Sequence, residues 1–144
     1  MKKVSDVLSR KVKTPISVPP TTTVIDSLKI MAEANIGSVL IMDGEKLLGI
    51  VTERDYSRKV VLKGKSSTDT MVSDIMSTAC PTVSRNDTIE KCMQIMSLEN
   101  VRYLPVMEDN TVIGIISMYD VVRETILSQE ETISNLKEYL YANV

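Results

Sequence analysis

Two short motifs hold the residue types best suited to binding a small polar ligand. Thr-Glu-Arg-Asp occupies residues 52–55, Ser-Met-Tyr-Asp occupies residues 117–120, and each follows an apolar run. An ionised carboxylate accepts hydrogen bonds from both hydroxyls of a ribose-like diol. A hydroxyl and free backbone N–H groups at a helix start suit phosphate oxygens, because the helix dipole is positive there. The motifs predict a site for a sugar phosphate; the alternative is that Asp55 and Asp120 are only N-caps, which stabilise by about 0.5–2 kcal/mol.

The two motifs differ in charge. Arg54 offers a fixed cation for a phosphate group, whereas its counterpart Tyr119 does not. Arg58 and Lys59 follow Asp55 in the sequence and raise the positive potential there. We therefore do not expect the two sites to be occupied equally.

Composition excludes several other functions. The chain has 144 residues, a formal net charge of −2 and no His, so it offers no imidazole base or imidazole metal ligand. No nucleophile–base pair and no paired carboxylates are visible, which argues against an enzyme. The slightly acidic balance argues against nucleic acid as a partner. The apolar runs are too short to cross a bilayer, and the first residues lack the apolar core of a secretory signal.

The cysteine pattern indicates neither a disulfide framework nor a metal site. Cys80 and Cys92 form no CxxC pair, and two cysteines in a chain of this length are typical of a reducing compartment. We expect Cys92 to be a core thiol, Cys80 to be partly exposed, and the protein to be cytoplasmic, without membrane contact.

A duplication organises the chain. Residues 49–55 (GIVTERD) match residues 114–120 (GIISMYD) at an offset of 65, from 49 to 114. Upstream, residues 4–9 (VSDVLS) match residues 72–77 (VSDIMS) at an offset of 68, from 4 to 72. The first copy therefore has three extra residues between Ser9 and Ile16. Because apolar positions match while surface residues diverge, the pattern indicates two copies of one buried scaffold.

Each copy predicts the element order β-α-β-β-α. In the first copy the expected elements are a strand at 16–18, a helix after the cap Thr23, strands at 38–42 and 47–51, and a helix from 55 to 60. Asn35 and Gly37 end the first helix, and Asp87 with Glu90 repeats the capping signal in the second copy. We expect an α+β (α/β) fold with repeats at 4–63 and 72–127, a linker at 64–71 and a helical extension at 128–144.

The C-terminal extension carries a narrow apolar seam. No Pro or Gly occurs from residue 121 to residue 144, so the last helix is expected to continue. The seam has the 4-3-4-3-4 spacing of a short coiled coil, with Val122, Ile126, Gln129, Ile133, Leu136 and Leu140. It either packs on its own domain or meets a partner helix or a second subunit.

Two such copies, each ending in Gly-apolar-apolar-Ser/Thr-x-x-Asp and a helix, resemble a tandem pair of cystathionine-β-synthase-type (CBS) domains, over residues 4–127. The resemblance implies two repeats packed with pseudo-twofold symmetry, two clefts for adenosyl ligands, and frequent dimerisation. It also implies a regulatory module without catalysis of its own, with no required cofactor, AMP as the first choice among adenine nucleotides, a homodimeric state and a possible protein target.

The resemblance also assigns residues to the clefts. The motif Asp binds the ribose, the Ser/Thr faces the phosphates, and backbone of the opposite copy frames the adenine. One cleft is expected to use Thr52, Arg54 and Asp55 with Thr82, Val83, Arg102 and Tyr103. The other is expected to use Ser117, Tyr119 and Asp120 with Ile16, Ser17, Gly37 and Ser38. For Gly37, close approach of a base to the backbone and a helix C-cap remain alternatives; for Arg102, which the pattern places on the surface, so do a phosphate contact and a solvated charge.

Overall fold

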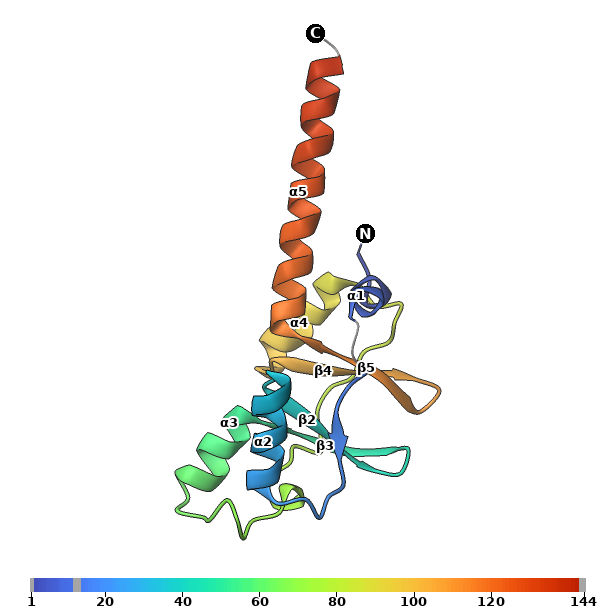
Figure 1. Ribbon diagram of the computed structural model, residues 1–144. Coiled ribbons are helices and arrows are strands. Elements are labelled where there is room, and N and C mark those ends of the chain that lie inside the picture. Colours follow the sequence, from blue (N-terminus) through green and yellow to red (C-terminus); the bar gives the residue numbers. More distant parts are fainter. Residues whose placement is uncertain (1, 12–13, 143–144) are drawn as a thin grey trace.

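The computed structural model describes residues 2–11 and 14–142. Figure 1 shows a mixed α+β body from which one long helix projects. In chain order the elements are α1 (Val4–Arg10), β1 (Ser17–Val18), α2 (Val24–Ala34), β2 (Ser38–Asp43), β3 (Lys46–Thr52), α3 (Glu53–Tyr56), a π-helix (Ser57–Val61), a 3₁₀ turn (Val72–Asp74), α4 (Ile89–Glu99), β4 (Tyr103–Glu108), β5 (Thr111–Ser117) and α5 (Met118–Ala142).

The two copies form two separate small sheets. In the first, β1 pairs parallel with β2 and β2 pairs antiparallel with β3. In the second, β4 and β5 form an antiparallel hairpin, and the counterpart of β1 is reduced to a parallel bridge between Val83 and Val106. Leu40 explains the difference, because its N–H donates to Ile16 O at 3.0 Å. Its counterpart Pro105 has no N–H to donate, so the ladder cannot extend.

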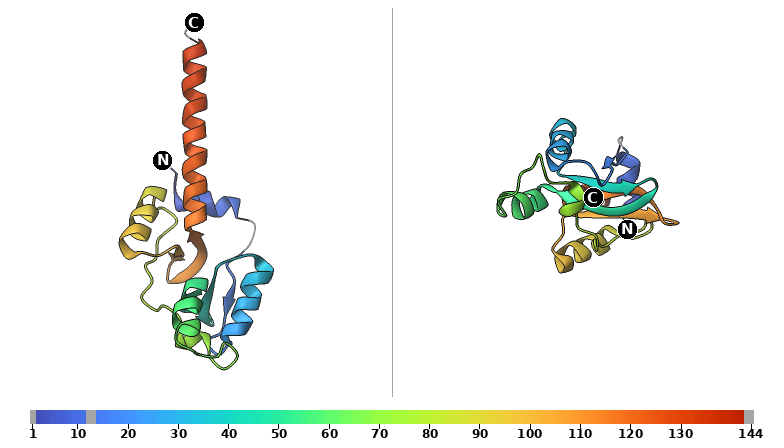
Figure 2. Two further views of the ribbon diagram at one scale, coloured as in Figure 1. Left: turned by 90° about the vertical axis from the view of Figure 1, so that its left-hand side faces the viewer. Right: turned by 90° about the horizontal axis from the view of Figure 1, so that it is seen from below.

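The first segment of each copy packs in the core of the other copy. Val4 and Val7 of α1 are buried in the cluster formed by the second copy, and Val72 and Ile75 are buried in the cluster formed by the first. The exchange is reciprocal down to the backbone, since Val4 N donates to Asp87 O at 2.9 Å and Val72 N donates to Thr22 O at 2.8 Å. Figure 2 shows α1 beside the β4–β5 half. The exchange ties the repeats together with approximate twofold symmetry.

The expected helix caps are correct in the first copy and wrong by one residue in the second. Thr23 caps α2 and accepts a hydrogen bond from Asp26 N at 3.3 Å, while Asn35 ends the helix with φ 53°. In α4 the N-cap is Thr88, which accepts from Lys91 N, and not Asp87. The Asp87 carboxylate instead accepts from Ser84 N at 2.7 Å.

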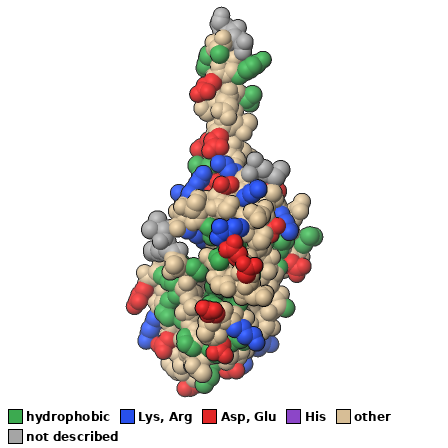
Figure 3. Space-filling model, turned by 90° about the vertical axis from the view of Figure 1, so that its right-hand side faces the viewer, with side chains coloured by type: hydrophobic (Ala, Val, Ile, Leu, Met, Phe, Trp, Pro, Cys, Tyr) green, Lys and Arg blue, Asp and Glu red, His purple; other side chains and the backbone are tan. Residues whose placement is uncertain are grey.

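Helix α5 confirms the expected long C-terminal helix and projects well beyond the body (Figures 1 and 2). Its base contacts α4 and β5. Hydrophobic side chains are visible along the projecting part in Figure 3. The apolar seam residues are about half exposed, at 51% for Val122, 49% for Ile126, 53% for Ile133, 57% for Leu136 and 62% for Leu140. Packing on its own domain therefore does not cover the seam.

Candidate functional site

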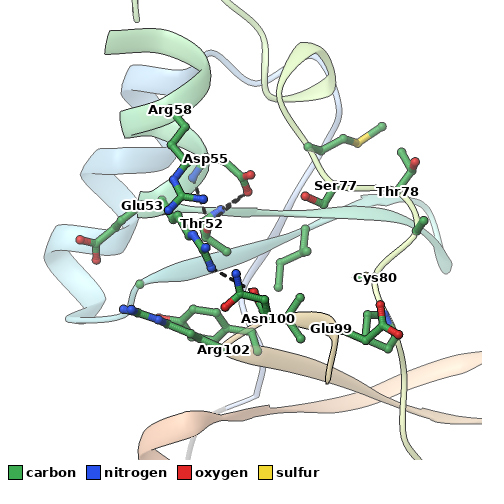
Figure 4. Close-up of a pocket in the computed structure, with 18 of the residues that line it drawn as sticks. Thr52, Glu53, Asp55, Arg58, Ser77, Thr78, Cys80, Glu99, Asn100 and Arg102 are labelled. Carbon is green, nitrogen blue, oxygen red and sulfur yellow. Dashed lines mark hydrogen bonds between the residues drawn. The ribbon is translucent and has the colours of Figure 1, made fainter. Parts of the chain in front are cut away.

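A cavity of about 760 Å³ lies between the two repeats. The first copy contributes Gly37, Ile50 and residues 52–55 and 58–59, at the end of β3 and the start of the helix that follows. The second copy contributes residues 76–81, which connect the 3₁₀ turn to the bridge residue Val83, and residues 99–103 between α4 and β4. Figure 4 shows these segments facing one another across the cavity.

Asp55 lies at the wall of this cavity and is 9% exposed. Its Oδ2 atom accepts from Thr52 N at 2.9 Å and from Thr52 Oγ1 at 3.1 Å, and Asp55 N donates to Thr52 Oγ1 at 3.1 Å. Oδ1 lies 3.0 Å from Lys59 Nζ. The carboxylate is therefore fixed in orientation by its own helix start, and its second oxygen contacts a lysine ammonium.

In both motifs the Asp is the third residue of the helix and not the N-cap, but it does take part in capping, since Asp55 Oδ2 accepts from Thr52 N and Asp120 Oδ2 accepts from Ser117 N. Thr52 is the N-cap of α3, and Asp55 is its third residue, completing a capping box. The helix expected from residue 55 begins at Glu53 and continues as a π-helix to Val61. The wider turn of the π-helix carries Lys59, whose Nζ also donates to Ile75 O at 2.8 Å. Such single π turns are frequent at functional sites.

Arginines from both repeats line the same cavity. Arg54 donates from Nη1 to Asn100 O at 3.0 Å, which joins the first repeat to the end of α4 in the second. Arg58 and Arg102 also line the cavity, and Arg102 is exposed, as its pattern predicts. In Figure 4 the Arg58 side chain extends near Thr52 and Asp55. The cavity is thus lined by the buried Asp55 carboxylate and by guanidinium groups from both repeats.

Gly37 and Tyr103 meet at one edge of the cavity. A Cβ atom on Gly37 would overlap the Tyr103 hydroxyl, and Gly37 O accepts from Glu53 N at 3.1 Å. Burial, and secondly the Glu53 carboxylate, raises the pKa of Tyr103, so the phenol stays neutral at physiological pH. Gly37, which was expected in the other cleft, therefore lies at the edge of this cavity, where it makes room for the Tyr103 ring. Its C-cap alternative is wrong, since Asn35 is the C-cap.

The structure unites five of the seven residues expected for this cleft. Thr52, Arg54, Asp55, Arg102 and Tyr103 line the cavity, whereas Thr82 and Val83 do not. Val83 is instead buried in the core of the second repeat. Sequence reasoning missed the preceding residues, namely Ser77, Thr78, Ala79, Cys80 and Pro81. These residues lie at or just after the end of the stretch 72–77, which matches residues 4–9. That match was the sequence signal for the segment that each copy packs in the core of the other copy.

The residues expected for the second cleft have different surroundings. None of Ile16, Ser17, Ser38, Ser117, Tyr119 and Asp120 lines either of the two cavities described for this chain. Tyr119 is 71% exposed, and Ser38 is buried. Asp120 Oδ2 accepts from Ser117 N at 2.8 Å and lies 2.6 Å from Lys11 Nζ. The second motif therefore keeps the local geometry of the first but carries a lysine from a distant segment.

Comparison with known proteins agrees with this architecture. The CBS domain family model matches residues 4–61 and 72–126. The chain belongs to the CBS-domain family. Within the family, it is 38% identical over 123 residues to the mitochondrial CBS domain-containing protein CBSX3 of Arabidopsis thaliana, covering 82% of this chain and 60% of that relative. The chain thus spans less than two thirds of that relative's length.

Solved CBS structures show the same fold. The crystal structure of the CBS domain protein NE2398 is 42% identical, with a TM-score of 0.83, covering 87% of this chain and 98% of that one. The CBS domain pair of protein MJ0100, solved in complex with 5′-methylthioadenosine and S-adenosyl-L-methionine, is 26% identical, with a TM-score of 0.74, covering 87% of this chain and 96% of that one. CBS proteins of this kind are generally regulatory rather than catalytic.

Two further properties concern the described residues of this CBS pair. Within residues 2–11 and 14–142, no helix combines the length and apolar character needed to cross a membrane. The same part of the chain holds no group of three or more Cys, Asp or Glu side chains placed to bind a metal ion. Cys80 and Cys92 are free thiols, the first half-buried at the cavity and the second buried, as expected.

Proposed function

We propose that this CBS pair is a non-catalytic regulatory module that binds an adenine nucleotide, AMP first, in the cavity between its repeats. The observation that carries the proposal is the Asp55 carboxylate at the cavity wall, fixed by Thr52 and Lys59, in a cavity that arginines from both repeats also line. A rigid carboxylate suits a ribose diol, and guanidinium groups suit phosphate oxygens.

The rest of the cavity suits the remaining parts of a nucleotide. Ile50, Met76, Pro81 and Val101 provide apolar surface for a planar base. Pockets of roughly 300–1,000 Å³ hold ligands of drug size, and this cavity of about 760 Å³ lies in that range. The adenosyl ligands of the MJ0100 pair support an adenosyl ligand here. The arginines favour a phosphorylated ligand over the cationic sulfonium of S-adenosylmethionine.

A second role, in assembly, has support of its own. The half-exposed seam of α5 has Ile126, Ile133 and Leu140 at one of its alternating positions and Val122, Gln129 and Leu136 at the other, with the spacing of a coiled coil. We propose that α5 joins two copies into a homodimer and that nucleotide binding alters how the dimer presents itself to a protein target. The alternative, a dimerising scaffold without a ligand, rests on the same seam. The two free thiols suit a reducing compartment such as the cytoplasm.

Thermal shift and calorimetry with AMP, ADP and ATP test the nucleotide proposal. A ligand at a hundred times its Kd stabilises the folded state by about 2.7 kcal/mol. Asp55→Asn keeps the shape of the side chain but removes its charge, and hydrogen bonds to charged groups contribute about 1.5–3 kcal/mol each. We therefore expect affinity to fall about tenfold to a hundredfold.

The matched control is Asp120→Asn, which makes the same change at the equivalent position outside the cavity. It is expected to leave the affinity of the first cavity unchanged. Protein freed of co-purified nucleotide that shows no shift with any of the three ligands would leave the scaffold as the better account. Equal losses in the two variants would show that the effect does not arise in this cavity.

A further inference from the structure

The two motifs differ in the segment that contacts the strand before each of them. At the first motif, Ile50 forms a backbone bridge with Ser77, in which Ser77 N donates to Ile50 O at 2.9 Å and Ile50 N donates to Ser77 O at 3.1 Å. At the second motif, the counterpart of Ile50 is Ile115, and its carbonyl oxygen accepts from Lys11 Nζ at 2.7 Å. Among the described residues, a side-chain ammonium thus binds the carbonyl oxygen whose counterpart at the first motif accepts from a backbone N–H.

The same ammonium reaches the motif carboxylate. Lys11 Nζ lies 2.6 Å from Asp120 Oδ2, and the Asp120 side chain is only 13% exposed. Lys59 pairs with Asp55 in the first cleft too, but it comes from four residues along the same helix and lines an open cavity beside the carboxylate. Lys11 comes from a distant segment and lies between β5 and the carboxylate. Lys11 therefore binds Asp120 from a segment outside helix α5.

The neighbouring residue anchors this segment. Arg10 Nη1 contacts the Glu124 carboxylate at 3.0 Å and 3.1 Å, and Glu124 is only 3% exposed. Leaving a buried carboxylate without its cation is costly. Because Arg10 is fixed to α5 in this way, its neighbour Lys11 is kept near Asp120.

The sequence shows where this arrangement comes from. The change of offset from 68 to 65 places three extra residues of the first copy between Ser9 and Ile16, the stretch that contains Arg10 and Lys11. The second copy lacks them, and its corresponding segment, residues 76–81, borders the open cavity. The repeats thus differ in length in the stretch between Ser9 and Ile16. The same stretch carries Lys11, which binds the carboxylate of the second motif from a distant part of the chain.

We propose that Lys11 is a built-in occupant of the second cleft, so that each chain binds one nucleotide and the identity of residue 11 sets that number. The proposal rests on the proposed function for the ligand class, since it assumes that Asp120 is able to accept a ribose once it is released. A nucleotide at the second cleft must displace the ammonium from Asp120 and from Ile115 O, and this competition weakens binding there. A tenfold weakening corresponds to about 1.4 kcal/mol.

Calorimetric titration with AMP and with ATP tests the proposal. The variants are Lys11→Met, which keeps the apolar stem and removes the charge, and Lys11→Gln, a second neutral variant in case the first folds poorly. Lys137→Met, a lysine change on the projecting part of α5, is the control. We expect one nucleotide per chain for the wild type and the control, and two for the Lys11 variants. Adding Asp120→Asn to Lys11→Met is expected to restore one.

Every outcome bears on the proposal. Folded Lys11 variants that bind no more nucleotide than the wild type overturn it, and so does a wild type that fills two sites with similar affinity. If the wild type fills a second site and the Lys11 variants lose it, Lys11 contacts the ligand, and the proposal is overturned. If the wild type binds nothing while Lys11→Met binds one nucleotide, the function proposed for the first cavity fails and the role of Lys11 stands. If neither protein binds, both fail.

Discussion

Replacing Gly37 by alanine tests whether the edge of the cavity is built as described. The added Cβ would overlap the Tyr103 hydroxyl, so the Tyr103 ring must move. Overpacking of this kind costs about 1–3 kcal/mol. Gly37 is not among the residues with positive φ, so alanine suits the backbone there. At compatible positions, Gly→Ala stabilises by about 0.4–1 kcal/mol.

The second change, Tyr103→Phe, removes the atom that causes the overlap. With the hydroxyl gone, the next neighbours of the added Cβ are Glu53 Oε1 at 3.2 Å and Tyr103 Cζ at 3.4 Å, of which the first is the end of a flexible side chain. We therefore expect Gly37→Ala to destabilise the wild type by about 1–3 kcal/mol and to be neutral or slightly stabilising in the Tyr103→Phe background.

Urea unfolding of the four proteins gives the coupling between the two positions as a double-mutant cycle. The difference between the two backgrounds predicts a coupling of about 1–4 kcal/mol, as expected for residues in contact. The unfolding slope should stay constant, so that midpoints report stability alone. Nucleotide affinity should fall in Gly37→Ala and recover in the double variant. A coupling near zero, or equal destabilisation in both backgrounds, would refute the placement of Tyr103 against Gly37.

Three further predictions concern the packing, the thiols and the helix. Gly49→Ala should destabilise the fold more than Gly114→Ala. The new Cβ would lie 2.7 Å from the backbone oxygen of Ser77 in the first case and 2.5 Å from the flexible end of the Leu8 side chain in the second. Urea midpoints in the reverse order would contradict this. Burial raises the pKa of Cys80, so its alkylation by iodoacetamide should be slow at neutral pH, become faster as the pH rises and be blocked by nucleotide. Burial raises the pKa of Cys92 to about 11, so Cys92 should stay unmodified. If nucleotide has no effect on the alkylation of Cys80, this would argue against its place in the cavity. Leu136→Glu should convert a dimer to a monomer in sedimentation while leaving nucleotide affinity intact; an unchanged mass would show that α5 is not the interface.

The sequence predicted the element order well because the duplication doubled each local signal. The helix start at Thr23, its end at Asn35, the strands that follow, and the long last helix are all confirmed. The shortened strand beside Val83 was not foreseen, although Pro105 explains it through a missing N–H donor. That effect depends on which strand faces the proline, and pairing between strands is not visible in a single sequence.

The candidate site was predicted in part for a related reason. The motif residues Thr52 and Asp55 are local and were found, and Arg102 and Tyr103 followed from the family resemblance. Gly37 was assigned to the other cleft although it lines this cavity, and residues 76–81 were missed. Both depend on contacts between residues far apart in the chain, because Gly37 lies against Tyr103 of the other repeat and residues 76–81 follow a segment that packs in the core of the first copy. Local patterns carry no information about such contacts.

The crystal structure of the protein with AMP tests the central claim most directly. We expect the ribose hydroxyls on the Asp55 carboxylate, the phosphate among the arginines that line the cavity, and the base against its apolar wall. An empty cavity at saturating AMP, with the Asp55 carboxylate still bonded to Thr52 and Lys59, would contradict the account.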